Sequence, residues 1–469
     1  MTSPEMTNSL KFGTSGLRGL AIDLQGREAR RYTLAFLRHL ESQGQLGGKM
    51  FLGRDFRASS PQITRDCASA ITQSGLIAVD CGHLPTPALA LHAMEAGCGA
   101  IMITGSHIPG DRNGLKFYSP TGEISKADEA GILAALRDDG EDHPAAAMVD
   151  EHEAATERYL ARFAGLLPAG ALTGLRVGVF EHSTVARDLL GRIMRAFGAE
   201  TVSLGRSDSF VAVDTEAFGD AVFAPLPGWV SDFHLDAIVS ADGDGDRPLL
   251  MDGNGAFIRG DVLGLLAARY LGAPCVVTPV TSNSAIERTG YFASVVRTRV
   301  GSPYVVAAME QGDGVVGFEA NGGTFVGSGI TANGQPLAPL PTRDAVLPLL
   351  CALGLAAGQA SSLDQLVATL PLQIALADRL QDVPSDKSGA FLQRLTENAA
   401  FAASFFAPHG IAGLSTIDGL QFRTQAGDMV HFRASGNAPE LRCYVEASTP
   451  ETARALLDWA MTAAVAQVA

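Results

Sequence analysis

Short apolar runs of strand length alternate with stretches of helical spacing along most of this chain. In the first part, residues 27–43 carry apolar positions at helical spacing, and later helices are expected at Ser60, as a helix cap, and at Thr86, each followed by proline. Strands that alternate with helices favour a parallel or mixed sheet covered by helices, with a site formed by loops at the strand ends. The strands expected here are residues 50–53, 76–79 and 101–103.

The same pattern begins again twice. Residues 175–180 predict a strand, Ser183 a cap and residues 185–197 a helix, and a strand at residues 236–240 leads into an aspartate-rich turn and a small hairpin at residues 252–255. Three similar units indicate internal duplication. The third unit is expected to contain a helix at residues 261–271, strands at 275–277 and 314–318, and an apolar helix at 340–355.

The end of the chain has a different pattern. Three strand-like segments joined by short turns come before a helix expected to start at Pro450, which predicts a separate α+β domain. An acidic segment without clear period, residues 137–150, marks the first domain boundary. The predicted architecture is therefore three similar α/β mixed-sheet domains followed by a C-terminal α+β domain. Their predicted ranges are residues 1–150, 151–255, 256–370 and 371–469.

Composition and charge narrow the class of protein. The chain has 469 residues, of which 46% are hydrophobic and 18% charged, so it can bury several cores. Its formal charge of −15 disfavours binding to nucleic acid, which requires many Lys and Arg contacts to phosphates. No apolar signal core or membrane-length apolar run is present, so a cytoplasmic protein without membrane contact is expected. The 6 cysteines include no CxxC pair, which favours ordinary thiols over disulfides or zinc.

One serine stands out as candidate chemistry. The stretch ITGSHIPGDRNGLKFY, residues 103–118, places Ser106 in a polar turn directly after an apolar strand. A hydroxyl exposed at such a strand end could carry a phosphoryl group. Judged locally, a turn and helix cap is the commoner role of a serine before a histidine.

Three aspartates alternate with glycines in ADGDGDR. Asp242, Asp244 and Asp246 would repel one another unless they share a cation, and carboxylate oxygens suit Mg²⁺ or Ca²⁺. A calcium EF-hand loop is excluded, because Arg247 replaces its essential glycine and Gly253 its bidentate glutamate. A solvated acidic turn is the alternative.

Other glycine-rich loops offer anion or hydroxyl contacts. FGTSGLRG, residues 12–19, could bring backbone and guanidinium close to an anion, and RASGNAPELR, residues 433–442, could form an anion-holding turn. GFEANGG, residues 317–323, suits sugar hydroxyls. Plain turns remain the alternatives. GDGVVG, residues 312–317, has dinucleotide-binding spacing but is expected to follow a helix and lead into a strand, which is the wrong context.

Together and in this order, FGTSGLRG, TGSHIP with NGLKF, DGDGDR, GFEANGG and RASGNAPELR closely resemble the α-D-phosphohexomutase family, which includes phosphomannomutases and phosphoglucomutases. The five motifs span nearly the whole chain. The resemblance implies four domains around one central cleft, each donating a loop. It implies an isomerase whose phosphoserine moves a phosphoryl group between C1 and C6 of a hexose phosphate through a hexose 1,6-bisphosphate, which also acts as activator.

The resemblance also assigns roles to residues. Ser106 would be the phosphoserine, and Mg²⁺ would be held by Asp242, Asp244, Asp246 and an oxygen on phosphorylated Ser106. Arg18 and Arg247 would stabilise charge, while His107 lies near that centre and Lys116 could transfer a proton in a closed cleft. The residues expected to bind the hexose phosphate are Glu319, Asn321, Arg433, Ser435, Gly436 and Asn437.

Some positions depart from the family's usual pattern. The common sugar loop reads GEMSGH, whereas this chain has Phe318 before the glutamate, Asn321 in place of Ser and Gly323 in place of His; likewise Asn437 and Ala438 replace Thr and Glu. Such Asn-containing loops look like those of some bacterial phosphomannomutases, so the expected substrates are mannose 6-phosphate and mannose 1-phosphate. The alternatives are a glucose or dual-specificity mutase, a phosphoglucosamine mutase, or a non-catalytic sugar-phosphate binding protein. Oligomeric state is not predicted.

Overall fold

The computed structural model describes residues 9–13, 16–138, 147–435 and 439–468. Contacts between Cα atoms divide the chain into two compact units, each described here by itself. The first unit comprises residues 1–277 and 301–368, and the second comprises residues 278–300 and 369–469. Within the described ranges, no helix combines the length and apolar character needed to cross a bilayer.

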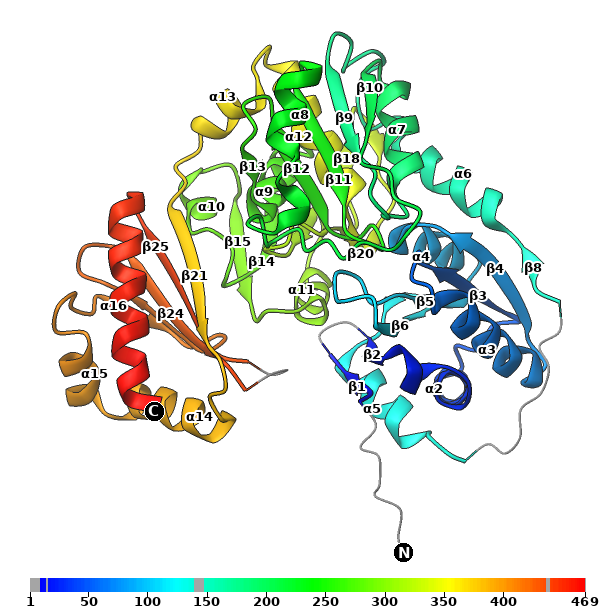
Figure 1. Cartoon of the computed structure of the whole chain (residues 1–469), viewed down its shortest axis with the longest axis horizontal. Coiled ribbons are helices and arrows are strands. Elements are labelled where there is room, and N and C mark those ends of the chain that lie inside the picture. The colour runs from blue at the N-terminus through cyan, green and yellow to red at the C-terminus, as the bar shows by residue number, and fades with distance from the viewer. Residues whose placement is uncertain (1–8, 14–15, 139–146, 436–438, 469) are drawn as a thin grey trace, which may run out of the picture. The chain divides into compact units, whose positions relative to one another are not determined.

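The first sheet of the first unit begins the chain (Figure 1). Helices α2, α3 and α5 share a core with it, where the rings of Phe36 and Phe117 lie 4.8 Å apart. Its strands are β1 (Lys11–Phe12), β2 (Leu17–Leu20), β3 (Lys49–Arg54), β4 (Ile77–His83), β5 (Gly99–Ile103), β6 (Arg112–Ser119), β7 (Gly122–Glu123) and β8 (Val149–Asp150). Its helices are α1 (Ala21–Leu24), α2 (Arg27–Ser42), α3 (Ser60–Gln73), α4 (Thr86–Glu95), α5 (Lys126–Ala134) and α6 (His152–Phe163).

Two further sheets follow in the first unit. The second contains β9 (Arg176–Phe180), β10 (Glu200–Leu204), β11 (Ala237–Ala241), β12 (Pro248–Asp252) and β13 (Phe257–Ile258), with α7 (Arg187–Ala196), the 3-10 turn η1 (Ala221–Phe223) and α8 (Leu226–Phe233). The third contains β14 (Cys275–Pro279), β16 (Val315–Phe318), β17 (Thr324–Val326) and β20 (Leu340–Asp344), with α9 (Gly260–Tyr270), α11 (Ser302–Met309), α12 (Val346–Gly358) and α13 (Leu363–Ala368). A short hairpin joins β18 (Thr331–Ala332) to β19 (Gln335–Pro336).

The three sheets repeat one arrangement of four strands. Two neighbouring strands run parallel, and two antiparallel strands continue the sheet: β3-β5-β6-β2, then β9-β11-β12-β13, then β14-β16-β17-β20. This common topology agrees with the internal duplication that the sequence indicates. In each sheet, one turn joins the second of these strands to the third.

That repeated turn positions three of the predicted motifs. The Ser106 turn joins β5 to β6, the aspartate turn joins β11 to β12, and the GFEANGG turn joins β16 to β17. Because each turn connects antiparallel neighbours, it is short and its side chains stay close to the strand ends. The fold therefore presents the same structural position three times, each time with different chemistry.

The second unit contains the last sheet. Its strands are entirely antiparallel in the order β21-β25-β24-β23-β22, and α16 lies along β21 and β25 (Figure 1). The elements of this unit are α10 (Ala285–Arg288), β15 (Ser294–Thr298), β21 (Ile374–Leu380), α14 (Ser385–Glu397), α15 (Ala399–Phe405), β22 (Gly413–Ser415), β23 (Leu420–Arg423), β24 (Met429–Ala434), β25 (Leu441–Ala447) and α16 (Pro450–Val468). This agrees with the predicted α+β class.

Three local predictions are wrong. Ser60 does not cap its helix, because its hydroxyl donates to the buried carboxylate of Asp55 at 2.7 Å and the N-cap position is Ser59. Ser183 lies in a turn and does not cap the helix, which begins at Arg187 with Ala186 at the N-cap position. The apolar segment at residues 340–355 is strand β20 followed by helix α12, since short apolar runs do not distinguish the two.

Two other predictions are confirmed. GDGVVG runs from helix α11 into strand β16, so it lacks the strand–turn–helix context of a dinucleotide site. The 6 cysteines are free thiols, and all except Cys275 are buried.

Candidate active site

Ser106 lies in the turn after β5 and is buried. Its φ of 55° is in the left-handed region, which non-glycine residues adopt only when their surroundings hold them there. Its backbone N–H donates to Thr104 Oγ1 at 2.7 Å, and its hydroxyl donates to Asp242 Oδ2 at 2.5 Å. No helix starts at this turn, so the interpretation of Ser106 as a helix cap is excluded.

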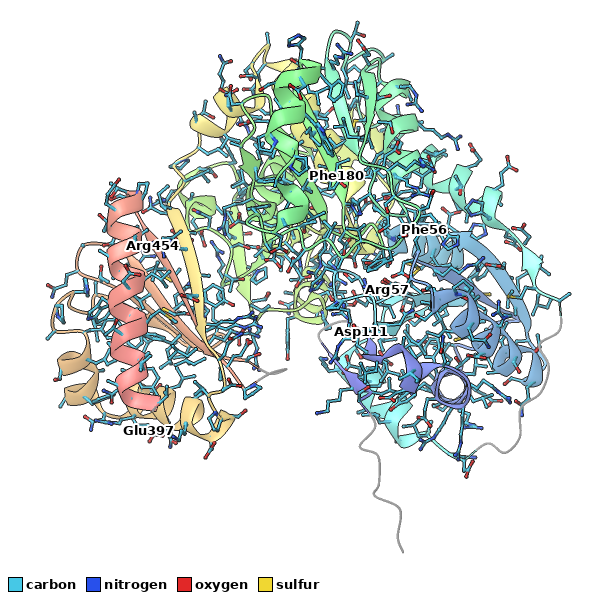
Figure 2. The ribbon with its side chains drawn as sticks, viewed as in Figure 1. Phe56, Arg57, Asp111, Phe180, Glu397 and Arg454 are labelled. Carbon is cyan, nitrogen blue, oxygen red and sulfur yellow. The ribbon has the colours of Figure 1, made fainter. Side chains whose placement is uncertain are left out.

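Arg57 holds this turn in place through hydrogen bonds to its backbone. It follows β3, the strand that pairs with β5, and it is labelled in Figure 2. All five of its guanidinium N–H groups are used: Nε donates to Asp55, and the two terminal nitrogens donate to four carbonyls. Those carbonyls belong to Ser106, Ile108, Pro109 and Arg112, at 2.6 to 2.9 Å.

Glycine is required at position 105 for this arrangement. A Cβ atom there would lie 2.6 Å from Arg57 Cζ, closer than real Cβ atoms come. Asp55 completes the support by accepting bonds from Thr104 Oγ1 at 2.7 Å and Gly105 N at 3.3 Å. Ser106 is thus fixed by a buried network that uses neighbouring strands of one sheet.

The aspartate turn brings three buried carboxylates together. One oxygen from each of Asp242, Asp244 and Asp246 lies within 4.8 Å of the other two. The turn is shaped by Asp242, whose Oδ1 accepts the backbone N–H groups of Asp246 at 3.2 Å and Arg247 at 3.1 Å. The Oδ1 atoms of Asp244 and Asp246 are buried and have no hydrogen-bond partner within the described ranges.

Those two oxygens without hydrogen bonds indicate that the aspartate cluster can hold a cation. Buried carboxylate oxygens normally have partners, and a cluster of like charges needs a positive charge to be stable. Oxygen-only ligands suit a hard divalent cation. The residues present therefore fit a divalent metal ion, which would supply charge neutralisation at the Ser106 hydroxyl when bound.

Lys116 and Thr86 connect this cluster to the first sheet. Lys116, on β6, donates to Asp244 Oδ2 at 2.5 Å and to Asp246 Oδ2 at 2.6 Å. The hydroxyl of Thr86, the first residue of α4, donates to Asp244 Oδ2 at 2.6 Å. With two carboxylates as partners, Lys116 neutralises charge in this arrangement, and its role as a proton carrier stays a prediction.

The local charges shift the aspartates in opposite directions. Burial, then repulsion from Asp244 and Asp246, raises the pKa of the Asp242 carboxyl well above its usual range. Burial also opposes ionisation of Asp246, but Arg343 and Lys116 outweigh it and hold its pKa below the usual range. A cation bound to the cluster would favour the ionised form of all three.

Arg18, Arg247 and His107 surround the same centre. Arg18 Nε and Nη2 and Arg247 Nε are buried without hydrogen-bond partners in the described part of the chain, and Arg247 Nε lies 3.8 Å from Asp246 Oδ1. Such donors suit a further anion. His107 Nδ1 lies 3.3 Å from Ser106 Oγ. Burial, helped by Arg247 and Arg18, lowers the pKa of His107 to about 2, so its imidazole is neutral.

The GFEANGG turn contributes two buried polar side chains. Glu319 Oε2 accepts a bond from Arg343 Nη1 at 3.0 Å, and Arg343 also bonds Asp246. Asn321 shapes its own loop, because its Oδ1 accepts the Gly323 N–H at 3.0 Å. The structure therefore links the predicted sugar loop to the aspartate turn through Arg343.

The predicted phosphate loop belongs to the second unit. Arg433 Nε donates to Asp418 Oδ2 at 2.7 Å, and the N–H of Ser435 donates to Glu440 O at 2.9 Å. Gly436 and Asn437 lie outside the described residues. The first unit thus gathers Ser106, His107, Lys116, Arg18, Arg247, Glu319, Asn321 and the three aspartates.

Sequence reasoning missed four supporting residues. Asp55, Arg57, Thr86 and Arg343 carry no ligand-binding motif of their own and act through other side chains. The signal for Asp55 and Arg57 was present, since GRDFR lies at the end of the strand beside the one that precedes the Ser106 turn. Arg343 lies in TRDAV, within a segment predicted to be helical, so nothing pointed to a site.

Comparison with known proteins identifies the family of this chain. Models for phosphoglucomutase/phosphomannomutase α/β/α domains I and III match residues 9–143 and 259–373. A phosphomannomutase of Sinorhizobium fredii is 47% identical over 95% of this chain and 97% of its own length. A phosphomannomutase of Salmonella muenchen is 40% identical over 95% of this chain and 94% of its own length.

Solved structures agree on the fold. A phosphoglucomutase/phosphomannomutase family protein of Burkholderia thailandensis superposes with a TM-score of 0.78 at 21% identity, covering 97% of each chain. At that identity the likeness speaks for architecture alone, while the two curated relatives carry the family assignment. With its domain matches and near full-length relatives, the chain belongs to the phosphoglucomutase/phosphomannomutase family of phosphohexomutases, enzymes of the isomerase class.

Proposed function

We propose that this chain is a phosphomannomutase that interconverts mannose 6-phosphate and mannose 1-phosphate, with Ser106 as the phosphoryl carrier. The observation that carries the proposal is the 2.5 Å contact between the Ser106 hydroxyl and Asp242, inside a cluster of three buried carboxylates. Two relatives named phosphomannomutase, at 47% and 40% identity, support the choice of sugar.

The bonds made and broken in the reaction balance between the phosphorylated enzyme and the sugar. In the first transfer, the bond between phosphorus and Ser106 Oγ breaks, and a bond to the free hydroxyl oxygen of the hexose monophosphate forms. The sugar hydroxyl loses a proton and Oγ gains one, so the proton count is unchanged. The hexose 1,6-bisphosphate then returns its other phosphoryl group to Ser106, and it serves as the activator that restores phosphoserine.

Charge around the transferred group is balanced by this chain's residues. Arg18 and Arg247 have buried nitrogens that make no hydrogen bond within the described ranges and suit the phosphoryl oxygens, and Lys116 offsets the charge of the aspartates. Mg²⁺ would be held by Asp242, Asp244, Asp246 and an oxygen on phosphorylated Ser106, and would neutralise charge there. His107 is neutral, so its imidazole can form a hydrogen bond with Ser106 Oγ without adding charge to the site.

Binding of the hexose phosphate would fall to other loops. Glu319 and Asn321 would contact sugar hydroxyls, and Arg433, Ser435, Gly436 and Asn437 would hold the phosphate that is not being transferred. The buried Glu319 carboxylate beside the aspartate turn supports the first assignment. In this organisation, residues 1–150, 151–255, 256–370 and 371–469 each supply one loop.

The test is turnover of mannose 1-phosphate and glucose 1-phosphate side by side, with Mg²⁺ and a catalytic amount of hexose 1,6-bisphosphate. We expect a higher kcat/KM for the mannose substrate, and loss of both activities in Ser106→Ala. A tenfold or greater preference for glucose would change the assignment to phosphoglucomutase. Turnover of glucosamine 6-phosphate alone would indicate a phosphoglucosamine mutase. Tight hexose phosphate binding without any turnover would indicate a binding protein.

A further inference from the structure

Arg343 is a buried arginine near the end of β20, and its side chain bridges two loops. It is 2% exposed. Its Nε and Nη2 donate to Asp246 Oδ2 at 3.0 and 2.9 Å, while its Nη1 donates to Glu319 Oε2 at 3.0 Å. A planar guanidinium can serve two carboxylates at fixed angles, which a lysine ammonium cannot do. One group therefore fixes a carboxylate of the metal turn and a carboxylate of the sugar loop.

The space for Arg343 comes from a glycine in the sugar loop. A Cβ atom at Gly323 would lie 2.6 Å from both Cγ and Cδ of Arg343 and 2.9 Å from its Cβ. Any side chain at position 323 would push Arg343 away from the turn. The loop departs from GEMSGH at this position by lacking histidine, and the buried volume beside it is filled by Arg343.

The bridge determines which oxygen of Asp246 is left for a cation. Asp246 Oδ2 accepts bonds from Lys116 at 2.6 Å and from two nitrogens of Arg343. The other oxygen, Oδ1, has no hydrogen-bond partner in the described ranges, and Arg247 Nε lies 3.8 Å from it. The bonds to Oδ2 thus hold the carboxylate in one orientation, and Asp246 is one of the three clustered aspartates.

We propose that Arg343 is a positioning residue that couples hexose recognition by Glu319 to cation binding by Asp246. The part concerning the hexose rests on the proposed function, whereas the part concerning the cation does not. Because the Arg343 guanidinium bonds both loops, a movement of Glu319 on sugar binding changes the affinity of the three aspartates for the metal ion. Metal binding must change the affinity for the hexose phosphate by the same factor.

The experiment compares Arg343→Lys and Gly323→Ala with the unaltered protein. The first variant keeps the charge but loses the bridge, and the second keeps the arginine but displaces it. We expect KM for mannose 1-phosphate to rise about tenfold or more in both, and Mn²⁺ binding to the metal-free protein, measured by electron paramagnetic resonance, to weaken about tenfold. Arg192→Gln is the control, because Arg192 is exposed and pairs only at the surface with Glu157 within the described ranges.

A double-mutant cycle tests the coupling itself. Glu319→Gln should raise KM about tenfold in the unaltered protein but less than about threefold in the Arg343→Lys background, because the interaction is already lost. Thermal midpoints show which variants fold, and if one does not, the other carries the test. Mn²⁺ affinity and KM within twofold of the control in either folded variant would overturn the proposal. Absence of any hexose phosphate turnover in the unaltered protein would overturn the proposed function while leaving the Mn²⁺ measurement decisive for Arg343.

Discussion

Arg57 lies at the Ser106 turn, which is proposed to carry the transferred phosphoryl group, and Arg433 lies at the loop proposed to bind the other phosphate. The two arginines differ in burial and in how many of their N–H groups are already bonded within the described residues. Arg57 is fully buried beside an equally buried Asp55, and all five of its N–H groups bond to the protein. Arg433 has a side chain 15% exposed, stands at the end of a hairpin strand and pairs with Asp418. A guanidinium whose donors are all used can position a loop but cannot bind substrate.

This difference indicates that the Ser106 turn serves phosphoryl transfer, whereas the loop near Arg433 serves substrate binding. The Ser106 turn is held by a network of buried charges whose geometry is complete without a ligand, which is the condition for preorganised transfer. The phosphate loop rests on an antiparallel hairpin in a separate compact unit. We therefore expect changes near Ser106 to act on kcat and changes near Arg433 to act on KM.

The largest effect is expected at the metal turn. Asp246→Asn removes one charge from the cation site and weakens the acceptor shared by Lys116 and Arg343. We expect kcat to fall by about 10³-fold or more, as it should when metal is removed by chelation. Steady-state kinetics across a Mg²⁺ titration measure this. If Asp246→Asn kept its kcat while chelation abolished activity, the cation would bind elsewhere.

The next effect compares one substitution in both regions. Arg57→Lys keeps the charge but cannot reach four carbonyls, so Ser106 is displaced and kcat should fall about 10²-fold. Arg433→Lys should raise KM about tenfold and leave kcat within about threefold. If the two variants changed kcat and KM by equal factors, the proposed difference between a residue that positions Ser106 and one that binds substrate would be wrong.

A smaller effect concerns stability. Arg57→Ala leaves the buried Asp55 carboxylate without its ion partner, and the free energy of unfolding should fall by about 3 to 5 kcal/mol. The exposed pair of Arg192 and Glu157 is the control, since Arg192→Gln should cost no more than about 1 kcal/mol. Chemical denaturation measures both. A loss below about 1 kcal/mol for Arg57→Ala would show that the network contributes little to stability.

The smallest effect is the dependence of stability on pH. Burial lowers the pKa of His182 from 6.5 to about 4, while its Nε2–H donates to Ala241 O at 2.9 Å. The unfolded chain binds the proton more readily, so the stability contribution is complete above about pH 6.5 and is lost as pH falls towards 4. Between about pH 7.5 and 5 the loss should be about 2 kcal/mol. His182→Asn, which tolerates the local φ of 22°, should reduce that slope, and an unchanged slope would assign it to other groups.

Much of the fold followed from patterns that depend on local sequence. Strand and helix spacing predicted the repeated α/β units, and the C-terminal α+β unit was visible in its short antiparallel strands. The segment at residues 340–355 failed, because an apolar run fits a buried strand as well as a helix. The prediction of Ser60 as a cap failed because its hydroxyl donates to the buried carboxylate of Asp55, which lies just before the helix.

Residues expected to contact ligands could be predicted from their motifs, whereas residues that act by contacting other side chains could not. Ser106 and the three aspartates carry recognisable local patterns, and the structure brings Ser106 within hydrogen-bonding distance of Asp242. Arg343 could not be found this way, since its partners lie 97 and 24 positions away in the sequence. Only the folded chain shows that the glycine of the sugar loop makes room for it.

The central claim, that Ser106 carries the phosphoryl group, is tested most directly by intact-mass measurement. The protein and its Ser106→Ala variant are incubated with hexose 1,6-bisphosphate and Mg²⁺, and mutase turnover is measured on the same samples. We predict that the unaltered protein gains the mass of one phosphoryl group and is active, while Ser106→Ala gains none and is inactive. Full mutase turnover by Ser106→Ala would contradict the account.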